Sequence, residues 1–378
     1  MPKSAPISHP ASPDAPSSPQ LPAPVFHDSA HHIKIFQGDC LEILAAIPEA
    51  TVDLIFADPP YFLSNNGITC HAGRMVSVNK GDWDKLPGDD LGPARARYDK
   101  VHAFNTLWLA ACQRVLAPNG TIWVSGTSHV IHSVGFAMQQ LGFKLLNDIS
   151  WVKPNPPPNL SCRYFTHATE TIIWAAKNSK ARHKFNYAHM KQLAGGKQMK
   201  SVWTIPPPEP WEKKFGKHPT QKPVALLERI LLAASSEGDL VLDPFSGSGT
   251  TLVAALRLSR RALAAELDAA WIHLSLVRIC SDLVQAQISV VCLHFDLDPS
   301  PRSMDRSRSP VTDVPPTRLV RRDRNFHFVG ASRRDVVFTV AADDLTAAWT
   351  SFHASAASTR EILFVIKTET EIYLAQGK

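Results

Sequence analysis

The sequence lacks the signatures of several protein classes. Its six cysteines are scattered, and no pair has the C-x-x-C spacing of a zinc site or a redox motif. This spacing also argues against a disulfide framework, which favours a reducing compartment. No apolar run approaches the ~18 residues needed to cross a membrane, and the N-terminus, rich in Pro, Ser and Ala, has no apolar core like that of a secretory signal. We therefore expect a soluble cytoplasmic protein without a metal site.

The excess of positive charge is small. Lys and Arg total 40 against 34 Asp and Glu, which gives a formal net charge of +6. This balance permits a nucleic-acid partner, but it does not distinguish one from an ordinary soluble basic protein. The length of 378 residues and the hydrophobic fraction of 44% suit two domains, or one large domain with an appendage.

Two proline-rich segments divide the chain. Residues 1–30 have too little apolar surface to offset their ordering entropy, so we predict a flexible tail. Residues 296–318, with Pro, Ser and Arg, are predicted to be a linker. The region between them, 31–295, is expected to form one large domain, and residues 319–378 a small α/β module of unknown role.

Within the large domain, apolar runs of strand length alternate with segments of helical periodicity. The runs expected to form strands are Ile33–Phe36, Val52–Phe56, Thr121–Ser125, Asp148–Val152, Thr171–Ala175, Leu240–Leu242 and Ala262–Ala265. Helices are expected over about 99–117, 129–141, 222–236, 250–259 and 268–286. This alternation predicts a doubly wound α/β sheet, with ligands at the carboxyl ends of its strands.

The stretch 154–217 breaks this rhythm, because it is rich in Pro, Lys, Asn and aromatic residues. Irregular backbone with basic and aromatic side chains suits contact with nucleic acid. Composition alone is equally compatible with an ordinary long surface excursion.

The first chemical motif is Asp58-Pro59-Pro60-Tyr61, directly after the predicted strand. Two prolines cannot continue a strand ladder, so the chain must turn out of the sheet here. The carboxylate and the Pro59 carbonyl can accept the two hydrogens of an exocyclic amine, and Tyr61 can stack on its ring. Holding both hydrogens frees the nitrogen lone pair for attack. The alternative is a proline-rich turn with a capping Asp.

The second motif runs from Asp243 to Thr251 between a predicted strand and a predicted helix. Gly247 and Gly249 let the backbone approach a ligand at the helix N-terminus. No Lys precedes Thr250, so this is not a Walker loop. Glu266 follows the next predicted strand, where an acid can accept hydrogen bonds from ribose hydroxyls. Together these features indicate a nucleoside-type cofactor.

The two motifs together resemble the amino-methyltransferase family of DNA-modifying enzymes, and their order resembles its circularly permuted beta group. Other segments match in the expected order: Gly38-Asp39-Cys40, Pro118-Asn119-Gly120, Trp151-Val152-Lys153-Pro154-Asn155 and His218-Pro219-Thr220-Gln221-Lys222-Pro223. The resemblance covers about residues 33–286. The stretches Tyr61–Gly67 and Val76–Asp84 are most similar to the MboII-type modification methylases.

The resemblance implies a Rossmann-like methyltransferase sheet with S-adenosylmethionine as cofactor and double-stranded DNA as substrate, a flipped adenine being methylated on its 6-amino group. The catalytic residues that it implies are Asp58, Pro59, Pro60 and Tyr61. The cofactor-binding residues that it implies are Asp39, Cys40, Asp58, His218, Thr220, Lys222, Asp243, Phe245, Ser246, Gly247, Ser248, Gly249, Thr250, Thr251 and Glu266. It places target recognition in 154–217 and allows a cognate restriction endonuclease and a second copy of the chain as partners.

Three other functions stay open. An N4-cytosine DNA methyltransferase shares the fold and the cofactor, but usually has Ser in place of Asp58. Methyltransferases of RNA or of protein glutamine often have Asn there and lack the H-P-T-Q-K-P segment. A catalytically silent DNA-binding protein would not need Asp58, Tyr61 and the glycine turn intact. For the adenine methyltransferase, Phe62–Asp84 is expected to be mobile without DNA and to become ordered when DNA binds; the alternative is an ordinary ordered surface loop.

Overall fold

The structure is a computed structural model that describes residues 20–62, 94–159 and 161–285. Outside these ranges it describes only short strands, namely β4 (Ile68–His71), β5 (Arg74–Ser77), β12 (Thr317–Arg322), β13 (Asn325–Val329), β14 (Thr339–Ala341), β15 (Leu363–Lys367) and β16 (Ile372–Gln376).

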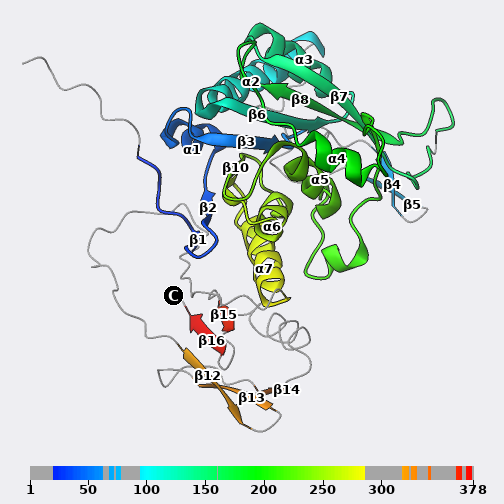
Figure 1. Cartoon of the computed structure of the whole chain (residues 1–378). Helices are drawn as coiled ribbons and strands as arrows, with labels where there is room; N and C mark the ends of the chain where they lie inside the picture. The colour runs from blue at the N-terminus through cyan, green and yellow to red at the C-terminus, as the bar shows by residue number, and fades with distance from the viewer. Residues whose placement is uncertain are drawn as a thin grey trace, which may run out of the picture.

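A nine-stranded sheet forms the centre of the fold, in the order β1-β2-β11-β10-β3-β6-β8-β7-β9 (Figure 1). Its strands are β1 (Phe26–Asp28), β2 (Ile33–Gln37), β3 (Val52–Ala57), β6 (Leu116–Gly126), β7 (Lys144–Val152), β8 (Thr169–Ala176), β9 (Val202–Thr204), β10 (Leu240–Asp243) and β11 (Arg261–Glu266). The run from β2 to β6 is parallel, while β8 is antiparallel to both β6 and β7. Every strand expected in the large domain is present.

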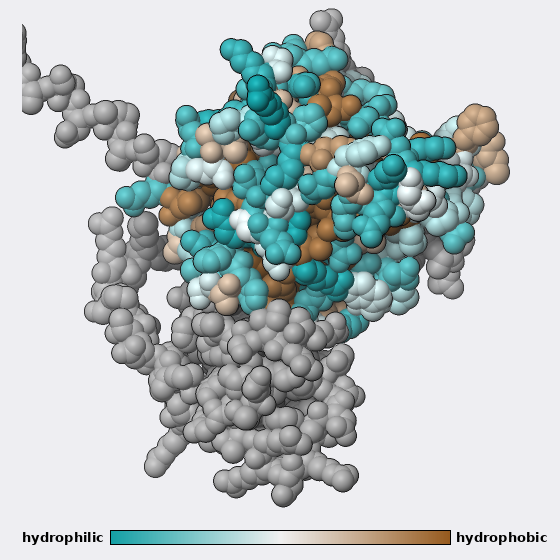
Figure 2. All heavy atoms as spheres, viewed as in Figure 1, coloured by the Kyte–Doolittle hydropathy of each residue, from teal (hydrophilic) through white to brown (hydrophobic). Residues whose placement is uncertain are grey.

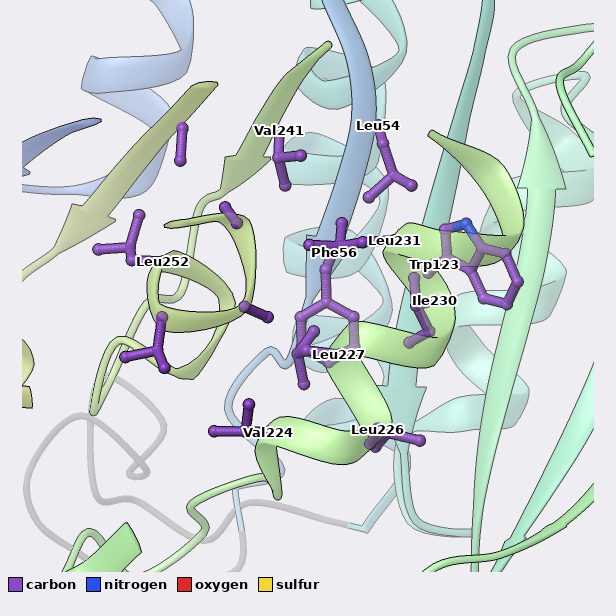
Figure 3. Packing of buried hydrophobic residues seen from close by; sticks show 14 of the residues in the cluster. Leu54, Phe56, Trp123, Val224, Leu226, Leu227, Ile230, Leu231, Val241 and Leu252 are labelled. Atoms are coloured by element: carbon purple, nitrogen blue, oxygen red, sulfur yellow. The ribbon is translucent and has the colours of Figure 1, made fainter. Parts of the chain in front are cut away.

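Helices cover both faces of the sheet. One hydrophobic cluster packs α1 (Cys40–Ala46), α2 (Ala94–Val115) and α3 (Ile131–Gln140) on one face. A second cluster packs α4 (Tyr187–Leu193), α5 (Val224–Ala234), α6 (Thr250–Arg257) and α7 (Ala269–Gln285) on the other. Apolar side chains of α5 point at Leu54 and Phe56 of β3 and at Trp123 of β6 (Figure 3). The predicted doubly wound α/β fold is therefore confirmed.

The order of the strands locates the ligand site. From β10 the chain passes through α6 to β11, whereas from β3 it passes through α2 to β6 on the opposite side of the sheet. The neighbouring strands β10 and β3 therefore form a topological switch point, which opens a crevice at their carboxyl ends. Asp58 directly follows β3 and Asp243 ends β10, so both motifs lie at this crevice.

The sheet begins earlier than expected. Phe26–Asp28 pairs with β2 as the antiparallel edge strand β1, although the tail was predicted to extend to residue 30. Phe26 is buried in the core, and the Asp28 carboxylate accepts hydrogen bonds from the backbone N–H groups of Ala30 and His31. One buried aromatic side chain and a local turn are thus enough to fix this end of the chain.

The stretch 154–217 is not a single irregular insertion, which corrects the prediction for it. Its strand β8 lies inside the sheet between β6 and β7, and β9 pairs with β7 at the edge. The run Ile172–Ala176 is buried, and the Trp174 ring stacks on Trp123 with the centroids 4.6 Å apart. The parts that remain outside the sheet are the loop between β7 and β8 and the segments on either side of β9, which contain α4 and a 3-10 helix, η2 (Pro210–Lys213).

The remaining predictions fall largely outside the described residues. Within Phe62–Asp84, β4 and β5 form an antiparallel hairpin, and most of the rest is not described. The predicted linker 296–318 also lies outside, except where β12 begins. The described strands of the C-terminal module form a separate antiparallel sheet in the order β14-β13-β12-β16-β15. None of the described helices is both long and apolar enough to cross a membrane.

Candidate active site

The Asp58 motif leaves the sheet at the crevice and folds back on itself. The Tyr61 hydroxyl donates a hydrogen bond of 2.7 Å to Asp58 Oδ1. Phe62, the next residue, has a backbone φ of 53°, which is unusual for a bulky side chain. It is held there by burial and by edge-on contact with Phe104 of α2, with the ring centroids 5.7 Å apart. The turn therefore presents the Asp58 carboxylate and the Tyr61 hydroxyl as one unit.

A cluster of alternating charges surrounds this carboxylate. Lys222 Nζ lies 2.5 Å from Asp58 Oδ2, 3.3 Å from the Tyr61 hydroxyl and 3.5 Å from Glu170 Oε2. Lys153, at the end of β7, forms a short ion pair with the other oxygen of Glu170. The side chains of Lys222, Asp58 and Glu170 are 6%, 14% and 11% exposed, so water screens these charges weakly.

The charges set one another's ionisation. Burial opposes the ionisation of Glu170, but the ammonium groups of Lys222 and Lys153 lower its pKa to about 2. Burial alone would lower the pKa of Lys222, whereas Asp58 and Glu170 hold it above its ordinary value. For Asp58 itself burial dominates and raises the pKa, with Lys222 opposing. Asp58 is thus the carboxylate of the cluster that takes up a proton most readily.

A cavity of about 680 Å³ adjoins this cluster. It is lined by the carboxyl ends of β3, β10 and β11, the start of α1, the middle of α2 and the segment before α5. Asp58 and Lys222 belong both to the lining and to the charge cluster. Every residue expected to bind the cofactor lines the cavity except Gly249. Pro60 lines it too, while Pro59 and Tyr61 are buried and are not part of the lining.

The glycine turn is built around two carboxylates. Asp243 accepts hydrogen bonds from the Phe245 N–H at 3.0 Å and from the Thr251 hydroxyl at 2.5 Å. Glu266 Oε2 accepts the Gly247 N–H at 2.7 Å, which fixes the carboxylate at the floor of the turn. Each oxygen of Glu266 keeps a further lone pair that can accept from a ligand hydroxyl.

Glycine is needed at two points of this turn for different reasons. Gly247 has a φ of 50°, and a Cβ there would lie 3.3 Å from the ring of His218. Gly249 has a φ of 70°, and a Cβ there would lie 2.7 Å from the side chain of Ser275. Gly249 is therefore required for packing against α7, whereas Gly247 and His218 face the cavity.

Other lining residues are held by local contacts. Asp39 caps α1 by accepting the Leu41 N–H at 2.8 Å, and burial raises the pKa of the neighbouring Cys40 thiol to about 12. The His218 ring packs edge-on against Trp271 at 4.4 Å and accepts the Thr220 N–H at 3.3 Å. The hydroxyls of Ser248 and Thr250 contact Arg278, which is buried beneath the turn.

Polar atoms around the cavity are left without partners. Ser246 Oγ, Gln221 Oε1 and Trp271 Nε1 are buried and make no hydrogen bond to any described residue, and all three residues line the cavity. Buried polar groups are normally satisfied, so a polar ligand is expected to complete them. The lining combines these groups with the aromatic side chains of Phe104 and Phe245, which suits a ligand with a planar base and a polar tail.

A profile of the family described as DNA methylase matches residues 52–276. The chain belongs to the DNA methylase family. Type II methyltransferase M2.DpnII of Streptococcus pneumoniae is 52% identical over 246 residues, covering 65% of this chain and 88% of that protein. Type II methyltransferase M2.MboI of Moraxella bovis is 47% identical over 252 residues, covering 67% of this chain and 89% of that protein.

The fold is shared with a solved methylase. The structure of the cytosine-N4-specific PvuII DNA methyltransferase aligns with this chain with a TM-score of 0.53 and 23% sequence identity. The alignment covers 68% of this chain and 88% of the PvuII chain. The family model and the two Type II relatives confirm the family predicted from the sequence. S-adenosylmethionine is the cofactor of this family, and the unsatisfied polar groups and aromatic rings of the cavity fit it. Ser246 and Glu266, which line the cavity, would hold the polar parts of this cofactor.

The sequence did not reveal every residue of this methylase site. Glu170 was missed, although it is a lone acid at the start of the apolar run of β8 and ties Lys153 to Lys222. Lys222 was expected beside the cofactor. The structure also brings its ammonium group to Asp58, which is 164 positions away in sequence.

Proposed function

We propose that this methylase transfers a methyl group from S-adenosylmethionine to the exocyclic 6-amino group of adenine at a specific site in duplex DNA. The observation that carries the proposal is the Asp58 carboxylate, held by Tyr61 at the edge of the cofactor cavity. This carboxylate is a hydrogen-bond acceptor at the position where a target amine would lie next to a bound methyl donor.

Bound S-adenosylmethionine supplies an electrophilic methyl group. Asp58 accepts one hydrogen of the target amine, and the carbonyl of Pro59 accepts the other. Both contacts draw the nitrogen towards tetrahedral geometry, so that its lone pair can form the new N–C bond as the donor's C–S bond breaks. The amine then loses a proton, and burial favours the protonated form of Asp58, so this carboxylate is suited to receive it.

Lys222 occupies the place from which a target amine would donate a hydrogen bond to Asp58. Its ammonium group lies on Asp58 Oδ2 but also reaches Glu170 and the carbonyl of Thr220, at 3.5 and 3.4 Å. An incoming amine can therefore displace the ammonium group from Asp58 without leaving it unpaired. Lys222 thus satisfies the buried carboxylate until substrate arrives.

The target base must leave the double helix to reach this site. An adenine inside a duplex cannot contact a carboxylate that is only 14% exposed, so the nucleotide has to be flipped out. The protein must then hold the flanking duplex, with phosphate contacts for position and base-edge contacts for specificity.

We assign target recognition to the parts of 154–217 that lie outside the sheet. The support is position and composition: the loop between β7 and β8 starts at Lys153 in the charge cluster, and the segment from 177 to 201 carries exposed lysines. Exchanging residues 154–168 and 177–201 for those of a relative with a different site, while keeping β8, should change the methylated sequence.

An N4-cytosine methyltransferase is the competing function. The cytosine-N4-specific PvuII enzyme shares the fold, so the fold does not choose between the two bases. The choice of adenine rests on the aspartate at position 58, where the cytosine enzymes usually have serine. Nucleoside analysis of DNA from a host expressing the protein should detect N6-methyladenine at one sequence. N4-methylcytosine in its place would overturn the assignment.

We further propose that the enzyme acts on cytoplasmic DNA, beside a cognate restriction endonuclease or as a solitary methylase. The relatives M2.DpnII and M2.MboI are named Type II methyltransferases, which supports a restriction–modification setting. Protection of host DNA from an endonuclease encoded beside the protein would support the first arrangement. Sedimentation of the purified protein would show whether two copies associate.

A further inference from the structure

The loop between β7 and β8 is tied to the charge cluster at both ends. Lys153 directly follows β7 and Glu170 lies on β8, and the two side chains form an ion pair across the base of the loop. The Lys153 N–H also donates to the Ala168 carbonyl at 2.8 Å, which closes the neck of the loop. None of the described residues between 154 and 168 lines the cofactor cavity, so the loop emerges on the side of Tyr61 and Glu170, away from the cofactor.

The loop has an internal framework. The Asn159 side chain accepts hydrogen bonds from Ser161 N at 3.1 Å and Ser161 Oγ at 2.8 Å, and it donates to the Tyr164 carbonyl at 2.6 Å. Cys162 has a φ of 52°, which tightens the turn. A loop held in this way presents its tip in one conformation, which lowers the entropic cost of binding.

The tip carries aromatic side chains into solvent. Phe165 is 96% exposed and Tyr164 is 62% exposed. The loop projects from the body of the protein (Figure 1), and an apolar group protrudes at the corresponding edge in Figure 2. Arg163, beside the tip, is also exposed and can contact phosphate.

We propose that Phe165 is a wedge that enters the DNA duplex and fills the space left by the flipped base. This inference rests on the proposed function, in which a duplex base must reach Asp58. Proteins that distort DNA frequently insert apolar side chains between base steps, which partly unstacks the neighbouring bases. Phe165 meets the requirements, since it is exposed, its loop is preformed, and the ends of that loop contact the residues around Asp58.

The test compares Phe165→Ala with wild type on two synthetic duplexes that contain the site mapped from host DNA. One duplex is fully paired, and the other has an abasic position opposite the target. Removing the partner base lowers the cost of flipping, so it should compensate for a missing wedge. We expect the single-turnover rate of Phe165→Ala to fall at least about tenfold on the paired duplex, and to return to within about twofold of wild type on the abasic one.

Two further variants serve as controls. Phe165→Trp should keep most of the rate, because it preserves an aromatic wedge. Phe136→Ala removes an aromatic side chain that is 55% exposed on α3, and it should behave as wild type on both duplexes.

Three results would overturn the proposal that Phe165 acts as a wedge. Unchanged rates for Phe165→Ala on the paired duplex would show that the ring is not needed. An equal loss on both duplexes would indicate a general role in binding or loop folding. A change in oligomeric state with no effect on flipping would indicate a protein partner.

The assay counts labelled methyl groups on DNA whichever base receives them. If wild type methylates cytosine, the adenine proposal fails while the comparison of duplexes still tests the wedge. If wild type methylates adenine and Phe165→Ala does so equally well on paired DNA, the wedge alone fails.

Discussion

Replacing Glu170 by Gln leaves the ammonium groups of Lys153 and Lys222 facing an uncharged amide in a buried cluster. The pKa of Glu170 falls from 4.5 to about 2 on folding, because both ammonium groups stabilise its ionised form. This difference corresponds to about 3 kcal/mol of stability at neutral pH. The side chain is only 11% exposed, so solvent screening removes little of that stabilisation.

We expect urea unfolding, followed by tryptophan fluorescence, to show a loss of about 3 kcal/mol for Glu170→Gln at pH 7. The matched control is Glu228→Gln, since Glu228 pairs with Arg257 at 3.4 Å but its side chain is 31% exposed. Exposed pairs contribute less than about 1 kcal/mol. The double variant Glu170→Gln, Lys153→Met should recover part of the stability lost in Glu170→Gln, because it removes one of the uncompensated charges.

The pH dependence gives an independent check. A carboxyl group with a lowered folded pKa contributes its stability above its unfolded pKa, near 4.5, and loses it as the pH falls towards 2. The difference in unfolding free energy between wild type and Glu170→Gln should therefore be constant above pH 5 and should become smaller below pH 5. If Glu170→Gln costs no more than Glu228→Gln, or if this difference does not depend on pH, the account of the charge cluster is wrong.

Three further predictions concern the glycine turn. Gly249→Ala should cost about 1–3 kcal/mol more in thermal unfolding than Gly142→Ala, because both have positive φ but only the former meets α7; equal losses would contradict this. Glu266→Ala should weaken S-adenosylmethionine binding about tenfold or more by calorimetry, while Glu237→Ala, an exposed acid outside the cavity, should bind normally. Burial raises the pKa of Asp243 to about 7. The free energy of unfolding of the wild type should therefore fall relative to that of Asp243→Asn as the pH rises from about 4 to about 7, with no further change above pH 7. A difference in unfolding free energy that does not depend on pH would refute this.

The sequence predicted the sheet well where strands are continuous apolar runs. Parallel strands buried on both faces, such as β3 and β10, have no polar alternation to obscure them. The two chemical motifs were placed correctly because each directly follows such a strand. The edge strands β1 and β9 were missed, since each has only three residues and pairs on one side.

The charge cluster could not have been predicted in the same way. Its members come from the residue after β7, from β8, from the turn after β3 and from the segment before α5, and no spacing in the sequence relates them. Composition also misled the interpretation of 154–217: the stretch was described as one irregular region, although the strand predicted at Thr171–Ala175 lies within it. The apolar run Thr171–Ala175 was itself the signal that part of this stretch belongs to the sheet.

The role of Asp58 in catalysis can be tested by measuring methyl transfer by Asp58→Ala together with the affinity of this variant for the mapped duplex. Asp58 acts on the target amine, whereas most of the affinity for DNA comes from phosphate contacts elsewhere. We predict that single-turnover transfer falls by about 10²–10³ or more, while duplex affinity stays within about threefold of wild type at the same salt concentration. Near-normal transfer by Asp58→Ala would contradict the assignment of this carboxylate as the group that activates the amine.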